Sequence, residues 1–162
     1  MVTPVPAFTD EIAKNGGSSA MLCFQCGTCT AGCPSGRFVA YRIRKLMRAA
    51  QLGLKDDTIN SEDLWQCTTC YTCAERCPRD VQIVDVVTAL RNIAVANGKL
   101  YEGHKKVAQN LIKYGHTVDN SKSAQRVELG LPENPPTVLA NSAAMAQFNK
   151  ILEITGFKKL VG

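Results

Sequence analysis

Two short stretches of the chain contain all eight of its cysteines, and both have the same spacing. Each reads C-x2-C-x2-C-x3-C-P, first as CFQCGTCTAGCP over residues 23–34 and then as CTTCYTCAERCP over residues 67–78. Such a repeat constrains the fold, because each loop must bring three thiols together while the fourth lies just beyond it. Proline lacks a backbone N–H and has a fixed φ, so Pro34 and Pro78 suit the first turn of a helix that follows each motif.

Three kinds of chemistry use clustered cysteines, and their spacing and setting separate them. Disulfides need an oxidising compartment, and nothing in the sequence indicates export. Structural zinc sites usually combine two C-x2–4-C pairs set well apart, which four closely spaced thiols fit poorly. The full run with its terminal proline matches the bacterial-type [4Fe–4S] motif, and two complete copies use every cysteine of the chain. The sequence therefore predicts two [4Fe–4S] clusters as cofactors.

The expected ligand sets come from the likeness to two-cluster ferredoxins. In those proteins the fourth cysteine of each motif ligates the other cluster. This likeness implies that the first cluster is held by Cys23, Cys26, Cys29 and Cys77. It implies that the second is held by Cys67, Cys70, Cys73 and Cys33.

Other side chains in and beside the motifs have two interpretations. Hydroxyls of Thr28, Thr30, Thr68, Thr69 and Thr72 can donate hydrogen bonds to sulfur, which raises a reduction potential, or they are ordinary polar loop residues. The aromatic residues Phe24, Trp65 and Tyr71 are expected to pack over the clusters rather than carry electrons.

Charge gives little support for nucleic-acid binding. The chain of 162 residues has a formal charge of +5, but this value treats the thiols as neutral. A cluster with four thiolates carries about −2 when oxidised, so two clusters lower the total to about +1. No apolar run approaches the roughly 20 residues of a membrane helix, and the N-terminal residues do not resemble a signal peptide. We therefore expect a cytoplasmic protein without a membrane segment.

The hydrophobic pattern predicts helices nearly throughout. One helix is expected over residues 37–53, with its apolar stripe at Val39, Ile43, Leu46, Met47 and Ala50 and its end at Gly53. Five cations lie on its remaining face: Arg37, Arg42, Arg44, Lys45 and Arg48. They form a docking face for an acidic partner, a field that favours reduced clusters, or a solvated helix face.

Further helices are expected beyond this one. A short helix follows Ser61, and another spans residues 79–98, with Asp80 as its cap, Gly98 as its end and Ile83, Val87, Leu90 and Ala94 as its stripe. A helix from Glu102 to Tyr114 precedes an irregular connection over residues 115–137. A last helix is capped by Ser142, has Met145, Phe148, Ile151 and Leu152 inward and stops at Gly156.

Strands are nearly absent from this pattern, so the sequence predicts an all-α fold, an α-helical ferredoxin core with appended C-terminal helices. We expect an N-terminal arm over residues 1–20 and a helical ferredoxin domain with two clusters over residues 21–98. Residues 99–162 are expected to form a C-terminal helical extension for packing or partner docking.

The remaining sequence offers no substrate chemistry. It has neither a G-x-G-x-x-G nor a G-x4-G-K-[ST] motif, so nothing supports nucleotide binding. Its two histidines, His104 and His116, lie outside the motifs, and no carboxylate pair or activated nucleophile stands out. The chain is expected to transfer electrons and to have no catalytic residue of its own.

The strings CFQCGTCTAGCPSGR and DLWQCTTCYTCAERCPRDV, together with LGLPENPP before a final helix ending in TG, resemble the iron–sulfur C subunit of heterodisulfide reductase. The resemblance covers about residues 20–157. Many helical ferredoxin-like proteins share the cysteine runs, and the Asp-Leu-Trp lead-in and the Pro-rich tail narrow the resemblance to this family.

The resemblance implies an electron-transfer component of a soluble complex. In that family a flavin-containing A subunit bifurcates electrons, and the C subunit relays one stream to a catalytic B subunit. The B subunit cleaves the mixed disulfide of coenzymes M and B in methanogenesis, and a hydrogenase or formate dehydrogenase can join the larger assembly.

Two alternatives stay open. One is an iron–sulfur relay subunit of another oxidoreductase, of the succinate or fumarate type or a related disulfide reductase. The other is a zinc-stabilised module whose basic helix binds nucleic acid.

Overall fold

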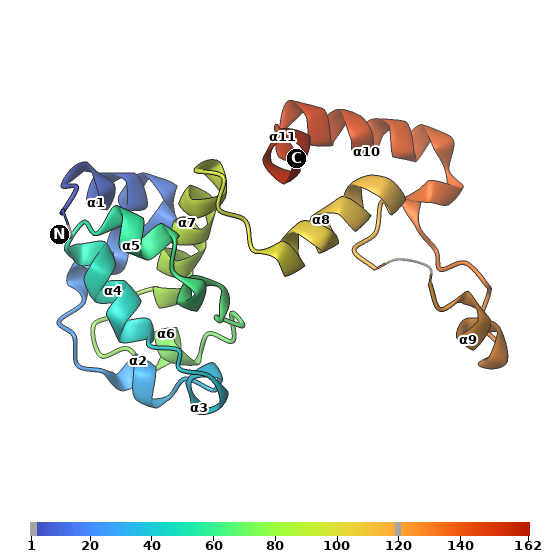
Figure 1. Cartoon of the computed structure of the whole chain (residues 1–162). Coiled ribbons are helices and arrows are strands. Elements are labelled where there is room, and N and C mark those ends of the chain that lie inside the picture. The colour runs from blue at the N-terminus through green and yellow to red at the C-terminus, as the bar shows by residue number, and fades with distance from the viewer. Residues whose placement is uncertain (1–2, 119–120) are drawn as a thin grey trace. The chain divides into compact units, whose positions relative to one another are not determined.

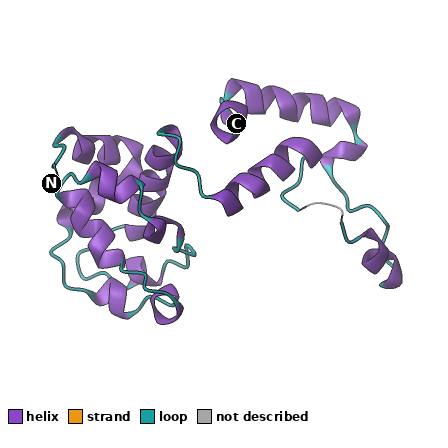
Figure 2. Ribbon diagram, viewed as in Figure 1, coloured by secondary structure: helices purple, strands orange, loops and turns teal. Residues whose placement is uncertain are grey.

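The structure is a computed structural model that describes residues 3–118 and 121–162. In these residues the chain forms helices and loops and no strand (Figure 1 and Figure 2). The predicted all-α class is confirmed. The chain divides into two units, of which one ends at Lys99 and the other begins at Leu100.

The first unit contains seven α-helices and three short turns of other helix types in its described part. They are α1 (Ala7–Ile12), η1 (Ala13–Gly17), η2 (Ser18–Leu22), α2 (Thr28–Ala31), α3 (Ser35–Phe38), α4 (Ile43–Gln51), α5 (Lys55–Ile59), η3 (Glu62–Trp65), α6 (Thr72–Glu75) and α7 (Ile83–Ala96). Figure 1 shows α2, α3 and α6, which belong to the cysteine motifs and their surroundings, at the end of the unit away from α1.

Helix α7 forms the centre of this unit. Its predicted stripe of Ile83, Val87, Leu90 and Ala94 is buried, and Val84, Val86, Ala89 and Ile93 are buried as well. A helix that is apolar on most sides is stable only when it is surrounded by other elements. Helix α1 supplies two apolar side chains to this core, because Phe8 and Ile12 are 0% and 1% exposed. This part of the expected N-terminal arm thus belongs to the core, while residues 1 and 2 lie outside the described residues.

The prediction of one helix over residues 37–53 is wrong at its start and correct at its end. The chain leaves α3 at Val39, whose φ and ψ of −130° and 160° are extended, and α4 begins only at Ile43. This break turns Tyr41 into the core, where it is 1% exposed, and leaves Val39 42% exposed. Beyond α4, Gly53 has a φ of +68°, which favours glycine and ends the helix.

The start of α7 also differs from the prediction. Asp80 does not cap this helix, because it has a φ of +58° and Gln82 is the residue that precedes the first turn. A turn in which Asp80 N–H donates to the Cys77 carbonyl separates Pro78 from α7. Pro34, in contrast, directly precedes α3. The expectation that each proline starts a helix is therefore correct for Pro34 and wrong for Pro78.

The second unit consists of α8 (Glu102–Tyr114), α9 (Ser123–Glu128), η4 (Val138–Ala140), α10 (Ser142–Ile154) and α11 (Phe157–Val161) in its described part. Helix α8 has the predicted bounds. Helix α9 lies in the stretch 115–137 that was expected to be irregular, and residues 119 and 120 of that stretch lie outside the described residues.

The cap of α10 is Asn141, not the predicted Ser142. The side chain of Asn141 accepts a hydrogen bond of 3.0 Å from the N–H of Ala144, so Ser142 is the first helical residue. Of the residues expected to face inward, Leu152 is buried and Ile151 is 57% exposed. Helix α10 therefore buries fewer of its apolar side chains than the sequence predicts.

No helix in residues 3–118 and 121–162 combines the length and the apolar character that a membrane crossing requires.

Candidate metal centres

The eight cysteines line two separate hollows of the first unit, four in each. The first hollow is lined by Cys23, Cys26, Cys29 and Cys77. The second hollow is lined by Cys33, Cys67, Cys70 and Cys73. Each hollow thus combines three cysteines of one motif with the fourth of the other. The structure groups the residues as the two expected sets, while their ligation of clusters stays a prediction.

The loops around the two hollows share an unusual backbone pattern. In each motif the residues directly before and after the second cysteine have positive φ, with 66° at Gln25 and 89° at Gly27 in the first motif and 54° at Thr69 and 62° at Tyr71 in the second. For residues other than glycine this conformation costs about 1–2 kcal/mol each. Backbone strain of this kind is concentrated at functional sites, where surrounding structure holds it in place.

Polar groups contact the sulfur atoms of both hollows. The hydroxyl oxygen of Thr28 is 3.3 Å from Cys26 Sγ, and that of Thr72 is 3.5 Å from Cys70 Sγ. These are equivalent positions of the two motifs. Among the other threonines singled out, Thr30 accepts from the Arg44 N–H over 3.0 Å, and Thr69 donates to the Thr68 carbonyl.

Two further donors to sulfur come from outside this pattern. Gln25 Nε2 donates to Cys23 Sγ over 3.4 Å, and the Val81 N–H donates to Cys77 Sγ over 3.4 Å. Hydrogen bonds to cluster sulfur raise the reduction potential. Sequence reasoning missed both donors, because neither the left-handed backbone of Gln25 nor the turn that precedes Val81 was predicted.

In each hollow one thiol is exposed, that of Cys26 or Cys70, and another is more buried, that of Cys29 or Cys73. The hydrogen bond with Thr28 lowers the pKa of Cys26, and that with Thr72 lowers the pKa of Cys70. Burial raises the pKa of Cys29, and it raises the pKa of Cys73 to about 11. The metal ligand is the thiolate, so a bound cation would favour the ionised form of Cys29 and Cys73.

The donor sets fit [4Fe–4S] clusters. All eight cysteines are free thiols. They lie in two sets of four, and four thiolates are the ligand set of one [4Fe–4S] cluster. The neighbouring helices α2 and α6 carry Cys29 and Cys73, and the charges of these two sulfurs influence one another. The two hollows are therefore adjacent.

Of the aromatic residues in this region, one packs against the core and the others line the hollows. Trp65 packs against the core, with the Arg91 guanidinium 5.7 Å from the centre of its ring. Phe24 lines the first hollow and Tyr71 the second, but they are 61% and 50% exposed. Tyr41, which the sequence did not single out, also lines the second hollow. Burial and the neighbouring sulfur atoms of Cys67 and Cys33 raise the pKa of its phenol.

The part of the chain that forms these hollows matches a known domain family, and the chain as a whole is similar to known proteins. Residues 22–82 match the family model of a 4Fe-4S dicluster domain. The C subunit of the H2:CoB-CoM heterodisulfide,ferredoxin reductase of Methanothermobacter marburgensis is 47% identical over 157 residues, which cover 96% of this chain and 85% of the relative. The iron-sulfur C subunit of the CoB–CoM heterodisulfide reductase of Methanopyrus kandleri is 49% identical, with 97% and 81% covered. The chain belongs to the family of heterodisulfide reductase C subunits.

A third member of this family is the C2 subunit of the H2/formate:CoB-CoM heterodisulfide,ferredoxin reductase of Methanococcus maripaludis, which is 42% identical over 99% of this chain and 84% of the relative. The family expected from the sequence is thus confirmed. The dicluster domain confirms the expected pair of [4Fe–4S] clusters, and it favours them over a zinc-stabilised module. Proteins of this family belong to oxidoreductase complexes, in which the chain has an iron–sulfur, electron-transfer role.

Proposed function

We propose that this chain relays electrons through two [4Fe–4S] clusters within a heterodisulfide reductase complex, towards the subunit that reduces the CoM-S-S-CoB heterodisulfide. The observation that carries the proposal is the pair of adjacent hollows with four cysteines each. The names of the relatives support the substrate, because each includes CoB-CoM heterodisulfide. The electron donor is a flavin-containing A subunit and the acceptor a catalytic B subunit.

The residues of this chain hold and insulate the relay. When bound, each cluster accepts and releases one electron without making or breaking a substrate bond. Cys23, Cys26, Cys29 and Cys77 hold the first cluster, and Cys33, Cys67, Cys70 and Cys73 hold the second. Because each set crosses between the motifs, neither cluster site is complete without the other motif. The buried Cys29 and the half-buried Cys73 limit the access of water to the region between the clusters.

The wider assembly follows from the same proposal. We expect the complex in the cytoplasm, with a hydrogenase or a formate dehydrogenase upstream, since H2 and formate occur in the names of the relatives. The segment 99–162 is proposed as an extension for packing or partner docking. A relay role in a succinate- or fumarate-type enzyme is the alternative, which the names of these relatives do not favour.

Metal analysis and purification of the native complex test the proposal. We expect about eight iron and eight sulfide per chain, and two interacting electron paramagnetic resonance signals after reduction. We also expect co-elution with a flavoprotein and a second iron–sulfur protein, and heterodisulfide-dependent oxidation of a reduced dye by this complex. A colourless chain that holds two zinc ions overturns the relay, and a complex inert to the heterodisulfide overturns the proposed substrate.

A further inference from the structure

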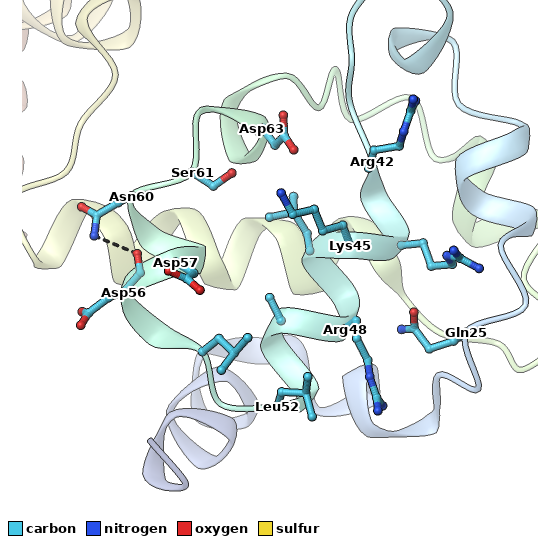
Figure 3. Close-up of a pocket in the computed structure, with 14 residues that line it drawn as sticks. Gln25, Arg42, Lys45, Arg48, Leu52, Asp56, Asp57, Asn60, Ser61 and Asp63 are labelled. Atoms are coloured by element: carbon cyan, nitrogen blue, oxygen red, sulfur yellow. Dashed lines mark hydrogen bonds between the residues drawn. The ribbon is translucent and has the colours of Figure 1, made fainter. Parts of the chain in front are cut away.

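An open groove of about 880 Å³ lies between α4 and α5, and its two walls have opposite charge. The wall at α4 carries Arg42, Arg44, Lys45 and Arg48. The wall formed by α5 and the residues after it carries Asp56, Asp57 and Asp63. Figure 3 shows Asp56 and Asp57 on one side of this α4–α5 groove and Arg42 and Gln25 on the other.

The charges of the α4–α5 groove are not neutralised by one another. The salt bridges found in the described chain join Lys55 to Glu11 and Lys158 to Glu153, and neither pair lines the groove. Arg44, Lys45 and Arg48 are exposed on α4, as are Asp56 and Asp57 on α5. Both walls therefore present charges that a partner molecule can contact, and apolar side chains such as Leu52 and Leu54 lie between them.

The α4–α5 groove adjoins the first hollow. Gln25 and Arg44 line both the groove and the hollow. Gln25 Nε2 donates to Cys23 Sγ over 3.4 Å and to Gln51 Oε1, on α4, over 3.3 Å. A molecule seated in the groove thus lies beside the first cluster site.

We propose that the α4–α5 groove docks a mixed-charge segment of a partner protein, with carboxylates against α4 and cations against α5. The opposite signs of the two walls select this occupant, because a segment with both charges meets complementary charge on each side. A nucleic acid contacts the α4 wall favourably, but its phosphates are repelled by the α5 wall. The proposal rests on the proposed function, since it places a partner of the complex beside the first cluster.

Cross-linking of the native complex tests the position of the partner. A carbodiimide joins lysine amines directly to carboxylates. We expect Lys45 to be joined to an aspartate or glutamate of one partner protein, identified by mass spectrometry of the linked peptide. Lys14 is an exposed lysine of η1 that does not line the groove. Linkage of Lys14 but not of Lys45 to the partner overturns the proposal.

Charge reversals on the two walls distinguish the occupants. We expect Arg48→Glu and Asp57→Lys each to lower the amount of partner protein retained per chain at least tenfold at low salt, with no effect of the matched control Lys14→Glu. If a nucleic acid is the occupant, Arg48→Glu weakens binding and Asp57→Lys strengthens it, which overturns the proposal. Retention equal to that of Lys14→Glu also overturns it. Iron content and resonance signals stay intact in each variant, so these outcomes are separate from a failure of the proposed function.

A second inference comes from an independent feature, the buried hydroxyl of Tyr41. The side chain is 1% exposed, and its oxygen makes no well-aligned hydrogen bond within the described chain, although the sulfur of Cys67 is close enough to act on it. Buried hydroxyl groups are nearly always paired in native proteins. Tyr41 lines the second hollow together with its four cysteines, so sulfur atoms of that hollow are the acceptors nearest to the hydroxyl. No tyrosine is among the described residues that line the first hollow.

We infer that the Tyr41 hydroxyl donates a hydrogen bond to a sulfur atom of the second cluster or its ligands. This bond stabilises the more negative, reduced cluster and raises the reduction potential of the second cluster. Tyr41 is thereby a positioning and tuning residue, and the first cluster has no equivalent of it among the described residues lining its hollow.

A redox titration of Tyr41→Phe, followed by electron paramagnetic resonance, tests this role. Phenylalanine keeps the packing and removes only the hydroxyl. We expect about a tenfold lower ratio of reduced to oxidised second cluster at a fixed potential, which is 59 mV for one electron, with the first cluster unchanged. Tyr71→Phe is the matched control, because Tyr71 lines the same hollow and is 50% exposed.

Two outcomes overturn the inference. One is an unchanged potential of the second cluster in Tyr41→Phe. The other applies if Tyr41→Phe fails to hold the second cluster. A fluorinated tyrosine at position 41, which is a stronger hydrogen-bond donor, is then expected to raise the reduction potential of the second cluster. A potential that stays constant or falls contradicts the hydrogen bond.

Discussion

The guanidinium of Arg91 donates a hydrogen bond of 2.7 Å from Nη2 to the carbonyl oxygen of Cys67. Its Nε donates to the carbonyl of Leu64 over 2.9 Å, and the same group lies over the ring of Trp65. Arg91 belongs to α7, so one side chain connects the central helix with the segment that leads into the second motif. The position of Cys67 in the second hollow therefore depends on α7 as well as on the motif itself.

Replacement of Arg91 by leucine is expected to destabilise the first unit. The change removes two hydrogen bonds from a charged donor, of which each contributes about 1.5–3 kcal/mol. We expect the free energy of unfolding to fall by at least the value of one such bond. Thermal denaturation of the cluster-loaded protein, followed by circular dichroism, measures the loss. Arg37→Leu, at an exposed arginine of α3, is the control, and equal melting temperatures of the two variants contradict the role of Arg91.

Serine replacements of the two fourth cysteines are expected to damage the cluster of the opposite motif. Cys77 lies in the hollow of Cys23, Cys26 and Cys29, so Cys77→Ser impairs the first cluster and largely spares the second. Cys33→Ser has the reverse effect, because Cys33 lies in the second hollow. Site-resolved spectroscopy of the reduced variants distinguishes the clusters. If Cys77→Ser affects only the cluster held by the second motif, the crossed ligation is wrong.

The sequence predicts the parts of this molecule that depend on local spacing. The cysteine spacing indicated the cofactors, and the apolar period of α7 indicated one buried stripe of that helix, since both patterns are local in the sequence. That Val84, Val86, Ala89 and Ile93 are buried as well depends on the elements packed around α7. The burial of Tyr41 was not predictable in this way. Its neighbours Val39 and Ile43 fit a helical period, and only the packing of the folded unit breaks the helix after Phe38 and turns Tyr41 inward.

The left-handed backbone conformation of the cysteine loops could not be predicted from the sequence either. Glycine at position 27 suggests a left-handed residue, but glutamine at 25, threonine at 69 and tyrosine at 71 do not. These residues adopt positive φ because the loop closes around its hollow, and contacts with distant residues hold it there. Gln25, for example, is bound to Gln51 of α4.

The two threonines that contact sulfur are expected to tune one cluster each. Thr28→Val removes the hydroxyl near Cys26 Sγ, and Thr72→Val removes the one near Cys70 Sγ. A neutral hydrogen bond contributes about 0.5–1.5 kcal/mol, so the potential of the affected cluster falls by about 20–60 mV. Redox titration of both variants measures the shifts. A change of both clusters in either variant argues for a general loosening of the fold instead.

Alanine at Gly53 is expected to destabilise the first unit more than alanine at Gly98. Both glycines have positive φ, at 68° and 75°, so both variants share the backbone penalty of about 1–2 kcal/mol. Only at Gly53 does the added Cβ meet another part of the chain, 2.7 Å from the carbonyl oxygen of Val5. Overpacking of this kind costs about 1–3 kcal/mol more. The free energy of unfolding of both variants is measured by chemical denaturation. If it falls equally in Gly53→Ala and Gly98→Ala, the contact between Val5 and the end of α4 is contradicted.

Helix α10 provides a matched pair for the last prediction. Asn141→Ala removes the side chain that accepts from the Ala144 N–H, whereas Ser142→Ala changes the residue that the sequence suggested as the cap. Loss of an N-cap costs about 0.5–2 kcal/mol, and an exposed serine in the first turn contributes far less. We expect Asn141→Ala to speed amide hydrogen exchange in the first turns of α10 by up to about thirtyfold and Ser142→Ala to leave it nearly unchanged. Faster exchange in Ser142→Ala than in Asn141→Ala restores Ser142 as the cap and shows that this helix starts one residue later than the structure places it.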